Sequence, residues 1–240
     1  MDFAQDFKNN RDAYKQTYSL LEDKKSKEIF TKVINFKISF DYTFMEGFTN
    51  DHEGQYFDKK ILPEFKNLSF VDGGGYVGDT VSEVIKHYPN YKKIYLIEPI
   101  PENIRIAKRD LALLENIEYF SCGIGKTKEV LYFNEEKSFS SIYGKGTQSV
   151  DIDTLDNIIK EKIDYIKLDI EGAEQDAIDG AKKSIQLYHP TLAICIYHKA
   201  EDWYKIPQKV LAIRDDYKIY LRHHMEGIFE SVLYFIPIKD

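Results

Sequence analysis

The sequence predicts an α/β fold in which a mostly parallel sheet ends in an antiparallel hairpin and is preceded by a helical extension. From Leu68 onward, short apolar runs alternate with amphipathic stretches, which is the pattern of parallel strands and their crossover helices. The last two apolar runs are joined by too few residues for a crossover helix, so they must pair antiparallel. Residues 1–60 are polar and helix-like. We therefore expect a helical extension at 1–60 and one α/β domain at 61–240.

The extension carries one apolar helical face. Ile29, Val33, Phe36 and Phe40 are spaced so that their side chains lie on the same stripe of a helix. We expect this stripe to be buried against the domain, with the extension acting as a lid or flank.

The elements of the sheet follow one another along the chain. The predicted strands are residues 68–72, 93–98, 117–122, 164–170 and 191–197, and the closing hairpin comprises 217–223 and 231–238. The predicted helices are residues 80–88, 101–115 and 173–186. Pro101 opens the second of these helices at the favoured first position.

Residues 129–150 interrupt this alternation with one alternating run and a stretch rich in glycine and serine. We expect a surface hairpin here, with a flexible segment. Residues 138–146 have the composition of a lid that closes over a bound substrate, although an idle surface loop has the same composition.

Composition limits the partners. The chain has 240 residues and a formal net charge of −7, so we expect neither nucleic acid nor an anionic membrane as a partner. Cys122 and Cys195 fall in predicted strands, which indicates buried thiols in a reducing compartment. No apolar run approaches a membrane span, which needs about 20 residues, and the first residues lack the apolar core of a secretion signal. We expect a cytoplasmic protein.

The stretch "FVDGGGYVGDT", residues 70–80, places a glycine-rich turn between the first strand and its helix. Ligands of open α/β sheets bind at this point, so the turn predicts a nucleotide-like cofactor. Gly73, Gly75 and Gly78 match the spacing of a dinucleotide-binding loop, but Asp72 places a carboxylate where a pyrophosphate would lie. S-adenosylmethionine has a cationic methionine end and no phosphate, so Asp72 favours this cofactor.

Two more features follow the glycine turn. Glu98 ends the second predicted strand, where a carboxylate can accept both hydroxyls of a ribose; this feature alone suits NAD equally well. Asp79 and Thr80 begin the next helix, and Asp79 is the better N-cap candidate because it lies directly before the helical pattern.

Four stretches, "FVDGGGYVGDTVSEV", "IYLIEPIPENI", "IDYIKLDIEGAEQDAIDGA" and "YHKAEDWYKIP", together resemble the FkbM-type family of S-adenosylmethionine-dependent methyltransferases. The motif "KLDIEGAE" is the most specific of these features. The resemblance implies a Rossmann-like, seven-stranded class I methyltransferase sheet. It also implies transfer of a methyl group to a hydroxyl of a sugar, a glycoconjugate or a natural product.

The motifs carry functional positions over to this chain. The acidic motif after the fourth strand contains Asp169, Glu171 and Glu174. We expect the cofactor to be bound by Asp72, Gly73, Gly74, Gly75, Asp79, Thr80, Glu98 and Asp169.

Methyl transfer to a sugar hydroxyl needs a group that takes up the hydroxyl proton. His198 ends the fifth predicted strand and Asp169 the fourth, so in this fold both should face one cleft. We predict His198 as the general base and Asp169 as the group that positions the acceptor, and we count Glu171 as a third catalytic residue. His223 and His224 are adjacent in a strand, so at most one of them faces that cleft.

Simpler roles compete with these assignments. Glu171 and Glu174 could merely complement a helix N-terminus, and His198 could be a hydrogen-bonded structural residue. An oxygen-rich cluster of Asp169, Glu171 and a histidine could hold Mg²⁺; we predict no metal site, and the sequence leaves this alternative open.

The sequence therefore predicts an S-adenosylmethionine-dependent O-methyltransferase that acts on a carbohydrate or a carbohydrate-linked group, for example a surface-polysaccharide component. The alternatives are an NAD-dependent sugar oxidoreductase and a non-catalytic nucleotide-binding module. The expected partner is a small-molecule or glycan acceptor, and a homodimer is compatible with the sequence.

Overall fold

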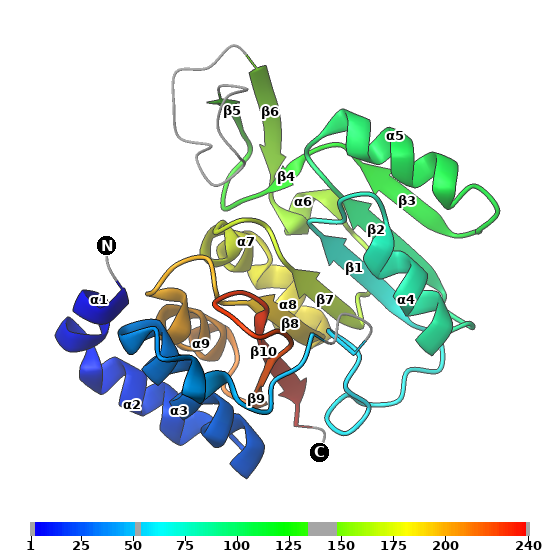
Figure 1. Ribbon diagram of the computed structural model, residues 1–240. Coiled ribbons are helices and arrows are strands. Elements are labelled where there is room, and N and C mark those ends of the chain that lie inside the picture. The colour runs from blue at the N-terminus through cyan, green and yellow to red at the C-terminus, as the bar shows by residue number, and fades with distance from the viewer. Residues whose placement is uncertain (1–2, 51–53, 134–147, 239–240) are drawn as a thin grey trace. The chain divides into compact units, whose positions relative to one another are not determined.

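The structure, a computed structural model, describes residues 3–50, 54–133 and 148–238 (Figure 1). The chain forms two compact units. The central unit is Glu64–Pro190, and the terminal unit combines Met1–Pro63 with Thr191–Asp240. In the described part of the chain, seven strands form one mostly parallel sheet, which confirms the predicted α/β class.

The central unit contributes the parallel strands. They are β1 (Ser69–Gly73), β2 (Lys93–Ile97), β3 (Ile117–Phe120) and β7 (Tyr165–Leu168), in the spatial order β3-β2-β1-β7. Each neighbouring pair is parallel, and α4 (Asp79–His87) and α5 (Pro101–Asp110) provide the first two crossovers. Pro101 is the first residue of α5, as predicted. All residues of β1 and β7 are buried, as expected for strands covered on both faces.

A small second sheet interrupts this alternation. It contains β4 (Gly123–Ile124), β5 (Glu129–Phe133) and β6 (Gln148–Asp153), in the order β4-β6-β5. β5 and β6 pair antiparallel, so the predicted hairpin is confirmed. The predicted lid at 138–146 lies outside the described residues.

The helix predicted at 173–186 is two helices, α7 (Glu174–Gly180) and α8 (Lys182–Tyr188). The prediction of one helix is wrong because a side chain from elsewhere starts the second. Asp156 lies in the short helix α6 (Leu155–Ile158). Its carboxylate accepts hydrogen bonds from the backbone N–H of Ser184 at 2.8 Å and from the Ser184 hydroxyl at 2.7 Å. Such a capping carboxylate satisfies donors that a new helix N-terminus leaves unpaired.

The terminal unit combines both ends of the chain. Its elements are α1 (Phe3–Asn9), α2 (Arg11–Leu20), α3 (Lys24–Ser39), the 3-10 helix η1 (Tyr42–Met45), β8 (Thr191–Cys195), α9 (Asp202–Ile213), β9 (Tyr217–His223) and β10 (Ser231–Pro237). β10 lies between β8 and β9 and is antiparallel to both, which confirms the closing hairpin. Every helix in the described residues is too short or too polar to cross a bilayer.

The N-terminal helices pack onto β9. Ser26 of α3 accepts the backbone N–H of Leu221 at 2.9 Å, and the guanidinium of the buried Arg222 pairs with Asp23, the N-cap of α3. The predicted apolar face is confirmed for its first three residues, which are buried. Phe40 is an exception: it ends α3 with φ of 55° and is 66% exposed, because a left-handed cap turns the side chain away from the stripe.

Both cysteines are free thiols. Cys195 lies buried in β8, as predicted. Cys122 lies between β3 and β4 and not in a strand, because β3 already ends at Phe120. Its thiol is half-buried, and burial raises its pKa to about 11.

Candidate active site

The glycine loop connects β1 to α4 and lies against the backbone that follows β7. Gly73 ends β1, and Gly74 has φ of +75°, a conformation that costs glycine little and other residues much. A Cβ built on Gly74 would stand 1.9 Å from the carbonyl oxygen of Asp169. Glycine at this position is therefore required by close contact between two backbones.

The same loop is fixed to the end of β2. The backbone N–H groups of Gly74 and Gly75 both donate to the carbonyl oxygen of Ile97, at 3.0 and 3.1 Å. A Cβ on Gly75 would lie 2.5 Å from the Leu96 side chain, so the third glycine also reflects tight packing. The loop therefore has one well-defined path between β2 and β7.

Helix α4 and its N-cap each lie one residue earlier in the chain than predicted. Gly78, with φ of +87°, is the N-cap of α4, and Asp79 is the first helical residue. The prediction that Asp79 caps the helix is wrong, because the tight turn needs a left-handed residue directly before the helix. Asp79 is exposed in the first turn, where the helix dipole stabilises a carboxylate, and Thr80 is buried.

Asp72 is fully buried and has a cationic partner within the protein. Its Oδ1 lies 2.9 Å from Nζ of Lys167, which is itself 2% exposed in β7. Its Oδ2 has no hydrogen-bond partner among the described residues. The sequence predicts a cationic ligand for this carboxylate, whereas the structure provides a protein cation that the prediction missed. A lysine inside the apolar run 164–170 was the available signal.

The charge of Asp72 depends on its surroundings. Burial raises the pKa of this carboxyl to about 6, the Lys167 ammonium opposes that rise, and Asp79 and Asp169 add to it. Asp72 therefore remains mainly ionised near neutral pH only with Lys167 beside it.

Glu98 follows β2 and is held by three donors. Its Oε1 accepts the backbone N–H of Ile100 at 3.0 Å and the Nδ2 of Asn103 at 3.1 Å, while Oε2 accepts the backbone N–H of Tyr76 at 3.2 Å. The carboxylate is 6% exposed. Two carboxylate oxygens have about four acceptor sites, so Glu98 keeps acceptor capacity for a ligand hydroxyl.

The acidic motif after β7 forms a strained turn. Glu171 has φ of 57° and Gly172 φ of 93°. Oε1 of the buried Glu174 accepts the backbone N–H groups of Ile170 and Gly172, at 2.9 and 3.3 Å. Glu174 therefore holds this turn through direct hydrogen bonds, a role more specific than the helix-dipole alternative.

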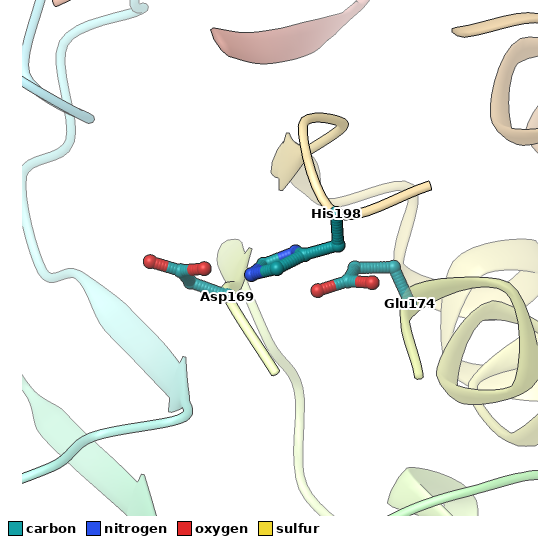
Figure 2. A group of neighbouring side chains, drawn as sticks. All are labelled: Asp169, Glu174 and His198. Atoms are coloured by element: carbon teal, nitrogen blue, oxygen red, sulfur yellow. The ribbon is translucent and has the colours of Figure 1, made fainter. Parts of the chain in front are cut away.

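Two acids of the motif, Asp169 and Glu174, come together at the end of β7. Figure 2 shows Asp169 and Glu174, whose carboxylates each bring one oxygen to within 4.8 Å of the other. Glu171, predicted as catalytic, is exposed.

The predicted histidines belong to the terminal unit. His198, also drawn in Figure 2, lies between β8 and α9 and is half-buried, with its ring 4.1 Å from that of Tyr197. His223 and His224 are buried, and their rings lie at hydrogen-bond distance from Ser231 and Tyr234. The role of His198 as general base stays a prediction.

The predicted cofactor residues of the central unit lie at one edge of its sheet. Gly73 is in register with Ile97 of β2 and with Leu168 of β7. Consequently the glycine loop, Glu98 and Asp169 follow three adjacent strands at their carboxyl ends, the usual binding edge of such sheets. A closely packed loop beside an acid with free acceptor sites fits a nucleoside bearing ribose hydroxyls.

Comparisons with known proteins agree with this arrangement. The family model "Methyltransferase FkbM domain" matches residues 72–225, which confirms the resemblance. The crystal structure of methyltransferase FkbM from Methylobacillus flagellatus KT is similar, with a TM-score of 0.86 and 26% identity. That match covers 98% of this chain and 60% of the other, so this chain spans less than two thirds of its length.

More distant similarity concerns the fold alone. An rRNA methylase from Streptococcus thermophilus superposes with a TM-score of 0.50 and 15% identity, over 78% of this chain and 96% of the other. No curated protein matches the chain at a significant level.

Proposed function

The chain belongs to the FkbM methyltransferase domain family, and we propose that it transfers a methyl group from S-adenosylmethionine to a hydroxyl of a carbohydrate or carbohydrate-linked acceptor. The observation that supports a nucleoside cofactor is the pairing of a closely packed glycine loop with Glu98 at the next strand end, and the match to the FkbM methyltransferase family favours S-adenosylmethionine over NAD. A surface-polysaccharide component is one acceptor of this class.

The position of Asp79 argues against a dinucleotide. A pyrophosphate would bind at the N-terminus of α4, where backbone N–H groups and the helix dipole attract anions. In this protein the exposed carboxylate of Asp79 already occupies the first turn. S-adenosylmethionine has no phosphate, and its ammonium and sulfonium groups are compatible with the nearby acids.

The protein's share of the reaction is binding, orientation and proton removal. In the proposed reaction the acceptor oxygen attacks the methyl carbon while the carbon–sulfur bond breaks, which releases neutral S-adenosylhomocysteine. Glu98 accepts ribose hydroxyls, Asp169 orients the acceptor, and His198 takes up the hydroxyl proton. Glu171, although exposed, stays a candidate for contact with the acceptor.

Ligand titration tests the cofactor. We expect calorimetry to show binding of S-adenosylhomocysteine and no response to NAD, and the reverse result would replace the methyltransferase with the oxidoreductase. A chain that binds S-adenosylhomocysteine but transfers no methyl group to any acceptor would support the non-catalytic nucleotide-binding module.

Turnover tests the base. With radiolabelled S-adenosylmethionine and a panel of glycan acceptors, His198→Ala should bind S-adenosylhomocysteine normally and lose about a hundredfold in kcat. Unchanged turnover would remove His198 from the mechanism. His87→Ala, on α4 in the other unit, is the matched control.

A further inference from the structure

Lys167 is a buried lysine in the middle of a parallel strand, a costly place for an ammonium group. Its Nζ donates to Asp72 Oδ1 at 2.9 Å and to the carbonyl oxygen of Gly74 at 2.8 Å. A buried ion pair contributes little net stability compared with apolar residues of the same volume. A role of the two charges in the geometry of the glycine loop would account for this cost.

We propose that Lys167 is a positioning residue that fixes the glycine loop, and through the loop Glu98, in the geometry that binds the cofactor. This inference rests on the proposed function, because it concerns the same cofactor site. Lys167 does not touch the reacting atoms in this account.

The loop is held from two sides, and Lys167 provides one of them. On the β2 side, the N–H groups of Gly74 and Gly75 donate to Ile97. On the β7 side, the carbonyl of Gly74 accepts from Lys167. With its N–H and its carbonyl both bound, the Gly74 residue has little freedom to rotate.

The fixed turn determines where the next N–H group points. Tyr76 lies two residues beyond Gly74, and its backbone N–H donates to Glu98 Oε2 at 3.2 Å. If the Gly74 carbonyl loses its donor, the loop can rotate and this N–H leaves Glu98. Lys167 therefore acts on the ribose-binding carboxylate through a short chain of covalent and hydrogen bonds.

Asp72 holds the ammonium in place. The charged groups that face its carboxyl are Lys167 on β7, Asp79 on α4 and Asp169 after β7. Because burial brings the pKa of Asp72 to about 6, the ion pair weakens as the pH falls through that value. Cofactor affinity should then fall over the same pH range.

The first experiment replaces Lys167 with methionine, which has similar length and no charge. At pH 7.5 we expect the Lys167→Met variant to bind S-adenosylhomocysteine about 10- to 100-fold more weakly, because the charge-assisted hydrogen bonds of Lys167 are lost. KM for S-adenosylmethionine should rise by a similar factor while kcat changes little. Lys167→Arg, which keeps the charge, should recover part of the affinity.

Lys37→Met is the matched control. Lys37 is also buried, and its Nζ donates to the carbonyl oxygen of Ile228 in the terminal unit. It shares the cost of burying a lysine but has no part in the loop. Unchanged affinity in this control, together with a loss in Lys167→Met, separates positioning from general destabilisation. Equal losses in both variants would overturn the inference.

A pH series gives a second readout. The wild-type affinity for S-adenosylhomocysteine should decrease between pH 7.5 and pH 5, whereas Asp72→Asn should show a flat and weaker profile. Parallel pH profiles in the two proteins would contradict the role of the ion pair.

A double variant tests the inference in case the single Lys167→Met variant is too unstable to study. If Lys167→Met does not fold, the double variant Asp72→Asn/Lys167→Met removes both charges and avoids an unpaired carboxylate. It should bind as weakly as Asp72→Asn alone, and wild-type affinity in the double variant would refute the inference. A wild-type protein that does not bind S-adenosylhomocysteine would instead refute the proposed function.

Discussion

Substitution of Gly74 by alanine should break the contact between the glycine loop and the chain after β7. The new Cβ would stand 1.9 Å from the carbonyl oxygen of Asp169, whereas ordinary contacts begin at 3.4 Å. The two backbones must therefore separate by about 1.5 Å, because neither partner is a flexible side chain.

The cost has three parts. An alanine at φ of +75° costs about 1–2 kcal/mol. Separation stretches the hydrogen bond from the Asp169 N–H to the Gly73 carbonyl, worth about 1 kcal/mol. It also stretches the bond from Lys167 to Gly74, worth about 1.5–3 kcal/mol because the donor is charged. We expect a loss of about 3.5–6 kcal/mol in the free energy of unfolding.

Gly47→Ala is the control that isolates the contact. Gly47 has φ of +87°, and a Cβ there would meet nothing within 4 Å. This variant should lose only the conformational cost, about 1–2 kcal/mol. Urea unfolding at pH 7.5 measures both variants, and calorimetry should show that only Gly74→Ala loses S-adenosylhomocysteine binding. Equal destabilisation of the two variants would refute the close approach of loop and strand.

Glu98→Gln keeps one acceptor oxygen but turns an amide toward an N–H donor, so affinity for S-adenosylhomocysteine should fall about 10- to 100-fold. Glu102→Gln, an exposed acid on α5 paired with Arg105, should leave that affinity unchanged in the same calorimetric titration. In the terminal unit, burial, with smaller effects of Lys37 and His224, lowers the pKa of His223 to about 4, from an ordinary value of 6.5. The unfolded chain therefore binds a proton first as the pH falls, and urea unfolding should show about 2 kcal/mol less stability at pH 5 than above pH 6.5 from this group. His223→Gln should remove that part of the pH dependence, and an unaltered pH dependence would show that His223 is not the group responsible.

The elements of the sheet were predictable because local patterns carry them. β9 coincides with the predicted run 217–223, and the short connection to β10 already required antiparallel pairing. Pro101 marked the first residue of α5. Each of these features depends on residues close in sequence, such as an apolar run, a fixed φ or a short loop.

The errors arose where distant residues decide the local structure. Asp156 starts a second helix at a place where the sequence reads as one continuous helix. Phe40 continues an apolar stripe in sequence but is the left-handed C-cap of α3, and its side chain is exposed. Gly78 takes the cap that Asp79 would have provided, because the loop before it must fit between two strands.

By itself, the sequence determined the α/β class, the order of the elements, the family and the place of a cofactor loop after the first strand. These follow from periodicity and from motifs whose residues are neighbours in the chain. Only the tertiary structure decided which charges meet. Asp72 and Lys167 are far apart in sequence and adjacent in register between β1 and β7, so pairing of the strands brings them together. Which residue pairs with a buried charge depends on the spatial order of the strands. That order depends on the packing of the whole sheet and cannot be inferred from any one segment of the sequence.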